Sequence, residues 1–427
     1  MTYDEALAFL DAHVNLEADP APRAAAMRLD GIRHVCSLMG DPQRAYPVVH
    51  LTGTNGKGST ARMITELLAA RGLSVGTYTS PHLERVNERL TWNGEPISDD
   101  DFAEVVGAIS HYEMRFSSHL SHFEVLTAAA FRWFADNAVD VAVVEVGLGG
   151  RYDATNVADA AVAVVTNVDL DHTAVIGPTR HDIALEKSGI VKPGSRLVVG
   201  ETDPDLVQVF AEAGAESVWL RGDDFECVEN RPAHGGRVLD LRTPGATYPD
   251  VYLPVHGSYQ GDNAAVALAA AEAFFGEPLH EEVVGQAFAD VRVPGRMEVV
   301  GRHPVRILDG AHNPAGAEAA AATLQSEFGG LASRVMVVGM LAGRDPVRML
   351  EPYLPVRLVV ACPPPSPRAM PAPEVAAAAE SLGIDAVVEP SVEAAVRRAQ
   401  VEAGEDELLL VTGSLYVVGS ARTLLKG

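Results

Sequence analysis

The stretch HLTGTNGKGST, residues 50–60, decides the fold of this chain. Residues 47–51 are mostly apolar and β-branched, which predicts a strand. A helical pattern follows from about residue 57 to residue 71. A glycine-rich turn therefore joins a buried strand to a helix, and parallel α/β sheets are built from this unit.

The same turn carries the parts of a phosphate-binding loop. Its glycines let backbone N–H groups converge, its lysine supplies a positive charge, and its hydroxyl groups lie at a helix N-terminus. The spacing differs from the common pattern G-x-x-x-x-G-K-[ST], because a glycine also follows the lysine. A glycine-rich turn without a ligand is the alternative interpretation. The residues concerned are Gly53, Gly56, Lys57, Gly58, Ser59 and Thr60.

The rest of the chain alternates short β-branched runs with alanine-rich helical stretches. This pattern predicts an α/β protein: a mostly parallel, P-loop-type ATPase sheet followed by a smaller Rossmann-like α/β domain. The alternation restarts after Pro294 and Gly295, so we expect domains at residues 1–295 and 296–427. Residues 235–255 predict a small antiparallel segment that edges the main sheet.

The net charge limits the class of partner. The 427 residues include 33 Lys and Arg against 58 Asp and Glu, which gives a formal charge of −25. Such a chain repels phosphate backbones, so we expect no nucleic acid and no membrane surface as a partner, and we expect a monomer. An anionic small molecule would need a local pocket of positive charge.

Cysteine usage and hydropathy indicate the compartment. The three cysteines, Cys36, Cys227 and Cys362, lie far apart and predict neither a disulfide framework nor a paired-cysteine metal site. The N-terminal residues have the pattern of an acidic amphipathic helix, not of a secretion signal. The longest strongly apolar run, residues 264–275, is shorter than the roughly 20 residues of a membrane span. We therefore expect a cytoplasmic protein.

Polar residues end three strands of the predicted sheet. Glu145 lies in VEVGLGGRYDATNV (residues 144–157), His172 follows the next strand, and Ser80 ends the strand after the phosphate loop. The carboxyl ends of parallel strands share one edge, so these side chains are expected beside the loop, where a Mg²⁺ ion bridging nucleotide phosphates would bind. Taken alone, His172 is an ordinary loop histidine and Ser80 a helix cap.

Two isolated cations have simpler interpretations. Lys187 follows Glu186 on a predicted helix, and from the residues alone it is an ordinary solvated lysine. Arg296 lies in the joint between the expected domains. It can reach a phosphate there, and an interdomain salt bridge is the alternative.

The second half of the chain has two further candidate turns. In LDGAHNPAG, residues 308–316, Asp309 and His312 follow a strand and precede a helix. In TGSLYVVG, residues 412–419, Ser414 occupies the corresponding position. Both turns place polar side chains at the carboxyl end of a predicted strand.

Taken together, these motifs resemble one family. GTNGKGS, TSPHLERVNER, SHFEVLTAAAF, VEVGLGGRYDATNV, the DHT and EKSGI pair, PGRMEVV and LDGAHNPAG occur in the order seen in folylpolyglutamate synthases and bifunctional dihydrofolate synthases of the Mur ligase superfamily. The resemblance runs from about residue 5 to the end. It implies ATP-dependent amide formation between L-glutamate and dihydropteroate or a (tetrahydro)folate, through an acyl phosphate.

The resemblance also implies roles for single residues. It assigns ATP phosphates to Gly56, Lys57, Gly58 and Ser59, one Mg²⁺ to Ser80, Glu145 and His172, and a second Mg²⁺ to a carbamylated Lys187. It further assigns ATP to Asn263, Arg296 and Asp309, and the incoming glutamate to His312 and Ser414. The pterin pocket is implied at Ser121, His122, Phe123, Glu124, Tyr152, Asp153 and Ala154.

Some segments depart from the family pattern, and other functions stay open. Val293 stands where an aromatic residue is frequent, GSYQGDN (residues 257–263) is a variant segment, and MLAGRDP (residues 340–346) lacks the usual Asp-Lys-Asp pattern. These departures concern substrate choice and interdomain contacts. The alternatives are a Mur-type ligase acting on another carboxylate and a nucleotide-binding regulator without catalysis.

Overall fold

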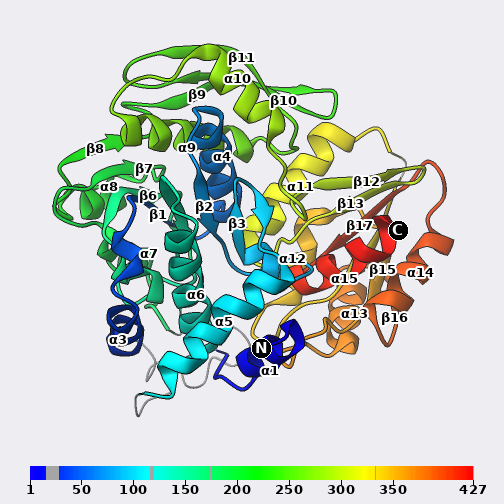
Figure 1. Ribbon diagram of the computed structural model, residues 1–427. Helices are drawn as coiled ribbons and strands as arrows, with labels where there is room; N and C mark the ends of the chain where they lie inside the picture. Colours follow the sequence, from blue (N-terminus) through cyan, green and yellow to red (C-terminus); the bar gives the residue numbers. More distant parts are fainter. Residues whose placement is uncertain (16–27, 116–119, 174, 332, 427) are drawn as a thin grey trace. The chain divides into compact units, whose positions relative to one another are not determined.

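The computed structural model describes residues 1–15, 28–115, 120–173, 175–331 and 333–426 (Figure 1). The chain divides into two compact units. The larger holds Met1–Arg231, Val238–Pro254 and Gln260–Val291, and the smaller holds Pro232–Arg237, Val255–Tyr259 and Arg292–Gly427. The division at residues 295 and 296 stays a prediction.

The larger unit is built on an eight-stranded sheet. Its central strands are buried on both faces, as expected of valine-rich strands in a parallel sheet. Only β3 pairs antiparallel, with β2 on one side and β4 on the other. In sheet order the strands are β4 (Glu95–Pro96), β3 (Leu90–Trp92), β2 (Val75–Tyr78), β5 (Val141–Glu145), β1 (Val48–Thr52), β6 (Ala160–Val165), β7 (Arg196–Val199) and β8 (Ser217–Leu220).

Helices cover this sheet and bury its apolar side chains. On one face, α1 (Tyr3–Asp11), α3 (Asp30–Leu38), α5 (Asp99–Glu113) and α6 (His122–Asp136) form one core, and α7 (Arg180–Lys187) and α8 (Pro204–Ala211) form another. The remaining long helices are α4 (Lys57–Ala70), which packs on β1, β2 and β5, α9 (Tyr259–Phe275) and α10 (Glu281–Asp290). Short 3₁₀ helices are η1 (Pro42–Arg44), η2 (Val86–Arg89), η3 (Ala154–Val157) and η4 (Ser188–Ile190).

The segment predicted to edge the main sheet forms a separate sheet, so that prediction was wrong. Its three strands are β9 (Glu226–Ala233), β10 (Gly236–Arg242) and β11 (Thr247–Leu253), in the order β11-β10-β9. The alternation of apolar and polar residues identifies such strands but does not say which neighbour they pair with.

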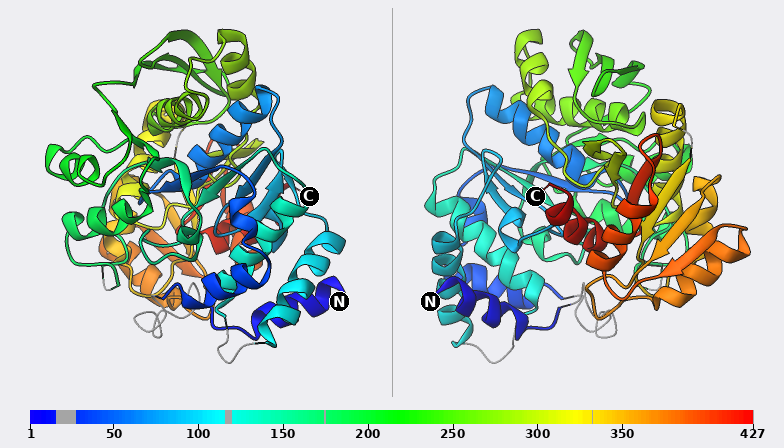
Figure 2. Two further views of the ribbon diagram at one scale, coloured as in Figure 1. Left: turned by 60° about the vertical axis from the view of Figure 1, so that its left-hand side comes forward. Right: turned by 90° about the vertical axis from the view of Figure 1, so that its right-hand side faces the viewer.

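The smaller unit has a six-stranded sheet, parallel except for β12 (Figure 2). Helix α12 contacts both α11 and α13, and α14 contacts α15. In sheet order the strands are β12 (Glu298–Arg302), β13 (Val305–Leu308), β17 (Leu408–Thr412), β14 (Arg334–Val338), β15 (Leu358–Ala361) and β16 (Asp385–Val388). The helices are α11 (Pro314–Phe328), α12 (Pro346–Leu350), η5 (Glu351–Tyr353), α13 (Ala372–Ser381), α14 (Val392–Glu402) and α15 (Leu415–Lys426).

The predicted fold class is confirmed: a parallel-rich α/β sheet unit is followed by a smaller α/β unit. The strand, turn and helix around residues 50–60 are also present, as β1 and α4. Among the described residues, no helix is long and apolar enough to span a membrane.

Candidate functional site

The phosphate-loop sequence forms a tight turn between β1 and α4. Gly56 caps the helix with φ +83°, a conformation that side chains disfavour. An added Cβ atom would lie 2.4 Å from Oδ1 of Asn263, so this glycine also allows α9 to approach the loop. The first N–H groups of α4 have no acceptor within the helix. A phosphate group at the loop could accept hydrogen bonds from these N–H groups.

This geometry predicts the effect of a single methyl group. Gly56→Ala should lower the free energy of unfolding by about 1 to 3 kcal/mol, because the new Cβ meets Asn263 and φ is positive. Gly58→Ala is the matched control, since its Cβ would lie 3.6 Å from Glu145, an ordinary contact. Urea unfolding of both variants checks the prediction. Equal stabilities would contradict this reading of the turn.

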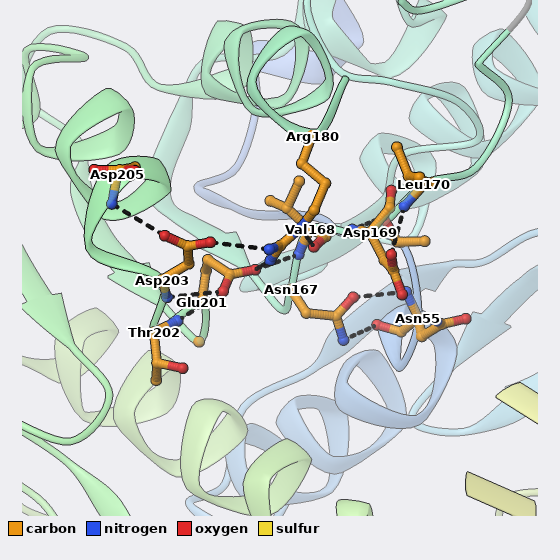
Figure 3. A network of polar contacts seen from close by, with 12 residues as sticks. Asn55, Asn167, Val168, Asp169, Leu170, Arg180, Glu201, Thr202, Asp203 and Asp205 are labelled. Atoms are coloured by element: carbon orange, nitrogen blue, oxygen red, sulfur yellow. Dashed lines mark hydrogen bonds and ion pairs between the residues drawn. The ribbon is translucent and has the colours of Figure 1, made fainter. Parts of the chain in front are cut away.

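Figure 3 shows a polar network that fixes the loop against the end of β6. The backbone N–H of Asn55 donates to Oδ1 of Asn167 (2.9 Å), and Nδ2 of Asn167 donates to the carbonyl of Asn55 (3.1 Å). The hydroxyl of Thr54 donates to the carbonyl of Asp169 at 3.1 Å. The loop therefore takes its position from the segment that leads to His172.

The network continues to the helix that carries Lys187. Arg180, the first residue of α7, donates from Nε to the carbonyl of Val168 (3.0 Å) and pairs with Asp203 (2.9 Å) and Glu201 (3.3 Å). Glu201 in turn accepts the backbone N–H of Val168 at 2.8 Å. Sequence reasoning missed Asn167, Arg180 and Glu201 as positioning residues. An asparagine directly after the β6 strand pattern was the one available signal.

Glu145 and Ser80 meet at the carboxyl edge of the sheet, as their strand positions predicted. Glu145 ends β5 and is 3% exposed. Its Oε2 accepts the backbone N–H of Ser80 at 3.2 Å and lies beside Gly58. His172 follows β6 with φ +51°, and its Nε2 is 3.5 Å from Oδ2 of Asp171. The loop and these oxygen and nitrogen donors thus lie on neighbouring strands.

Lys187 is buried, so the prediction from the residues alone, that it is an ordinary solvated lysine, was wrong. It ends α7 and is 3% exposed. The backbone passes close by, because a Cβ on Gly150 would lie 3.0 Å from Cα of Lys187. Burial, and then the nearby Lys57, lower the pKa of Lys187 to about 7, against the attraction of Asp171, Glu186 and Asp153. A large fraction of this amine is therefore neutral and nucleophilic at neutral pH.

The buried amine of Lys187 should lower the protein's free energy of unfolding. The unfolded chain binds a proton at Lys187 up to its ordinary pKa of 10.5, but the folded chain releases it at about pH 7. Between these values the unfolded state binds more protons, so this residue's contribution to stability rises with pH. Below pH 7 the penalty is complete, and Lys187→Met should raise the free energy of unfolding by up to about 5 kcal/mol.

Urea unfolding of wild type and Lys187→Met, from pH 6 to pH 9 without bicarbonate or nucleotide, measures that difference. The gain should shrink as the pH rises. Lys426→Met, at a half-exposed lysine, is the control and should show no such trend. A gain that is independent of pH would contradict the assigned pKa.

The pterin-pocket candidates divide into cap residues and wall residues. Ser121 and Glu124 form a capping box at the start of α6, with the Ser121 hydroxyl 2.8 Å from Oε2 of Glu124. Phe123 packs on Gly147, where a Cβ would lie 2.5 Å from the ring, and its ring centroid is 5.8 Å from that of Tyr78. His122 is buried next to it. Phe123 therefore supplies the flat apolar surface of this group.

Asp153 is held by its own loop. It is 6% exposed and accepts backbone N–H groups from Leu148 (2.9 Å) and Thr155 (3.0 Å) and the Thr155 hydroxyl. Burial raises the pKa of Asp153 to about 6 against these hydrogen bonds. Thr155 also contacts Nε2 of the fully buried His50 at 2.9 Å. The sequence contained no signal that His50 and Thr155 would support Asp153.

The two neighbours of Asp153 in the chain, which are also pterin-pocket candidates, differ in exposure. Tyr152 is half-exposed, and Ala154 is buried at the start of η3.

The remaining candidates gather in the smaller unit. Asp309 follows β13, is 3% exposed, and accepts N–H groups from Met297 (3.0 Å) and Ala311 (2.9 Å). Burial raises the pKa of Asp309, and Arg296 opposes this shift. Arg296 donates to the carbonyl of Gly310 at 3.0 Å. Ser414 is 1% exposed, and its Oγ accepts the N–H of Val417 at the start of α15.

His312 has a defined tautomer in this cluster. Its Nδ1 lies 3.0 Å from the carbonyl oxygen of Gly310, which can only accept a hydrogen bond. Nδ1 therefore carries the proton, and Nε2 of the neutral ring is an acceptor. Within the described ranges, no group of three or more His, Cys, Asp and Glu side chains is arranged as a metal cluster.

Comparison with known proteins gives the family. The Mur ligase middle domain matches residues 51–271, and the Mur ligase glutamate ligase domain matches residues 295–415. The chain is 38% identical to a Mycobacterium tuberculosis protein named dihydrofolate synthase/folylpolyglutamate synthase, over 93% of this chain and 89% of that protein.

Comparison with solved structures supports the same family. A Mycobacterium tuberculosis folylpolyglutamate synthase complexed with ADP has TM-score 0.92 and 37% identity, over 100% of this chain and 98% of that one. Escherichia coli FolC in complex with DHPP and ADP has TM-score 0.87 and 30% identity (99% and 97%). A Yersinia pestis bifunctional synthase with AMPPNP and Mn ion has TM-score 0.84 and 31% identity (100% and 98%). This chain belongs to the folylpolyglutamate synthase/dihydrofolate synthase family of the Mur ligases.

Proposed function

We propose that this protein is an ATP-dependent ligase that joins L-glutamate to dihydropteroate, to (tetrahydro)folate, or to both. One observation carries the proposal. The glycine-rich loop at α4, the buried carboxylate of Glu145 and the buried amine of Lys187 converge at one edge of a parallel sheet. The names of the relatives and the ligands in their structures suggest the substrate class.

The loop has the features that a nucleotide's phosphates require. Gly56 leaves no room for a side chain, α4 begins at Lys57, and Nζ of Lys57 lies 3.1 Å from the carbonyl of Gly53, which keeps the ammonium group at the loop. We assign the phosphates to Gly56, Lys57, Gly58 and Ser59. Asn263, which contacts Gly56, is assigned to ATP together with Arg296 and Asp309.

The donor set also fits a hard divalent cation. We assign Ser80, Glu145 and His172 to Mg²⁺, because carboxylate and hydroxyl oxygens are the donors that this ion prefers. We assign a second Mg²⁺ to the carbamate of Lys187. A carbamate forms when a neutral amine attacks CO₂ and loses a proton, and the pKa of about 7 makes this amine available. When bound, the ions neutralise phosphate charge.

Two bond exchanges complete the proposed reaction. A carboxylate oxygen of the pterin acid attacks the γ-phosphorus of ATP, the bond to the bridging oxygen breaks, and ADP leaves with the electron pair. The glutamate amine then attacks the acyl carbon, the carbon–oxygen bond breaks, and phosphate leaves with the former carboxylate oxygen. Lys57 and Arg296 stabilise the negative charge that accumulates on the transferred group.

The pterin acid and the incoming glutamate each need a binding site of their own. We assign the pterin to a wall around Phe123, Asp153 and Ala154, with Ser121, His122, Glu124 and Tyr152 beside it. We assign the incoming glutamate to His312 and Ser414. His312, whose Nδ1 is held 3.0 Å from the carbonyl of Gly310, is the base that we assign to the amine's proton.

The remaining features of the proposal concern the whole protein. We propose a cytoplasmic monomer with domains at residues 1–295 and 296–427, which binds neither nucleic acid nor membrane. The charge of −25 and the three cysteines, none of which forms a disulfide, support this view.

Phosphate release tests the function. A ligase should release phosphate from ATP rapidly only when a pterin acid and L-glutamate are both present with Mg²⁺. A nucleotide-binding regulator should hydrolyse ATP slowly under every condition, and a Mur-type ligase for another acid should not respond to the pterin. Either of these outcomes would overturn the proposal.

A further inference from the structure

A cavity of about 890 Å³ opens in the larger unit, on the outer side of the segments that flank Lys187. Leu185 and Gly189 line it, whereas Lys187 between them is buried and does not. Arg151 and Tyr152 form another part of its wall. The volume falls within the range of about 300 to 1,000 Å³ that is usual for small-molecule sites.

Four cations from three segments line this cavity. They are Arg28 and Arg33 around the start of α3, Arg151 in the loop after β5, and Lys192 before β7. Burial lowers the pKa of Lys192, and Arg33 lowers it further, so these two charges act on each other. Bringing like charges together is unfavourable unless an anion lies between them.

The lack of acidic partners is unusual for this chain. Acidic residues exceed basic ones by 25, and elsewhere arginines pair with them, as Arg180 does with Glu201 and Asp203. In the described part of the chain, none of the four cavity cations forms an ion pair. The side chains of Arg151 and Lys192 instead donate to backbone carbonyls, those of Leu185 and Asn156 respectively, both at 3.4 Å.

Acidic groups are nevertheless present. Asp30 and Glu212 also line the cavity, and Asp159 raises the pKa of Lys192. Four cations against two acidic side chains leave the lining positive in a protein of strongly negative charge. The cavity is therefore suited to an anion with several spaced charges, which distant cations can contact at the same time.

We propose that this cavity binds the γ-glutamyl tail of folates that already carry several glutamates. The inference rests on the proposed function, because each added glutamate contributes one more free α-carboxylate. Tyr152, which lines the cavity, donates its backbone N–H to Oε1 of Glu186 at 3.2 Å, and Glu186 directly precedes Lys187 in the chain. The product of one round then binds as the acceptor of the next with an additional charged contact.

Kinetics with two acceptors test the inference. We compare the KM for a folate with three glutamates to the KM for the monoglutamate, in wild type and in Arg33→Gln/Lys192→Gln. Each exposed charge pair contributes about 0.2 to 1 kcal/mol, so removing two such pairs should raise the ratio of the two KM values roughly 2- to 30-fold in the variant. Arg44→Gln/Arg302→Gln removes the same charge outside the cavity and should leave the ratio unchanged.

A binding measurement separates the tail from other anions. Calorimetry with free γ-linked triglutamate should detect binding to wild type that weakens in Arg33→Gln/Lys192→Gln and at high salt. Inorganic tripolyphosphate is the second probe. If tripolyphosphate binds and the triglutamate does not, the cavity is a general anion site and the tail assignment is wrong.

The outcomes distinguish the inference from the function on which it rests. If wild type forms glutamylated product but the KM ratio is the same in both double variants, the cavity assignment fails and the ligase function stands. If wild type forms no glutamylated product with any folate acceptor, the proposed function itself fails.

Discussion

Lys57→Ala should lower the rate of ligation by roughly 10²- to 10³-fold, the usual cost of losing one preorganised contact to developing charge. Nζ of Lys57 lies 3.1 Å from the carbonyl of Gly53 and 3.4 Å from that of Thr54, so the ammonium group is held at the phosphate loop before any ligand arrives. The substrates are anions and the chain itself is strongly negative. This charge therefore has no substitute close by on the loop.

Steady-state kinetics with ATP, dihydropteroate and L-glutamate measure this effect. Arg71→Ala is the matched control, because Arg71 follows the other end of the same helix and makes a half-exposed pair with Glu277. The control should stay near the wild-type rate. A Lys57→Ala variant that also stayed within a few-fold of wild type would remove Lys57 from the phosphate site.

Lys187→Ala should cause the second large loss, of roughly 10²-fold or more, because it removes an anionic group that we assign to a metal ion. If the lost group is a carbamate, small carboxylates such as acetate should restore part of the activity by entering the vacated space. The side chain is 3% exposed, so that space is enclosed by protein. Failure of rescue in a folded variant would count against the carbamate.

The carbamate also has a direct spectroscopic signature. The chain has only four lysines, Lys57, Lys187, Lys192 and Lys426. Incubation with ¹³C-bicarbonate should therefore give one carbamate resonance that is lost in Lys187→Ala and retained in Lys426→Ala. A resonance that survives in Lys187→Ala would assign the carbamate to another amine.

The sequence located the site through local patterns. A strand that ends in a polar residue places that residue at the carboxyl edge of a parallel sheet, and this rule alone put Glu145 and Ser80 next to the phosphate loop. The structure has Oε2 of Glu145 3.2 Å from the Ser80 backbone nitrogen. The glycines of the loop were equally readable, because positive φ at Gly56 is a local requirement.

Other features depend on contacts that a local pattern does not contain. The lysine of EKSGI resembled any lysine at the end of an amphipathic helix, but in the structure it is buried, and the loop at Gly150 packs against its backbone. The bond between Asn55 and Asn167 joins residues 112 positions apart. Likewise, β10 and β11 were recognisable as strands, but β9 was not predicted, and the separation of all three from the main sheet is a matter of pairing partners.

The central claim is that the acceptor carboxylate is phosphorylated before glutamate attacks it. An isotope experiment tests it most directly: dihydropteroate labelled with ¹⁸O in its carboxylate is incubated with the protein, ATP, Mg²⁺ and L-glutamate, and both products are analysed by mass spectrometry. Each glutamylated product should be matched by one phosphate that carries one ¹⁸O atom. Unlabelled phosphate, or phosphate released without a glutamylated product, would contradict the account.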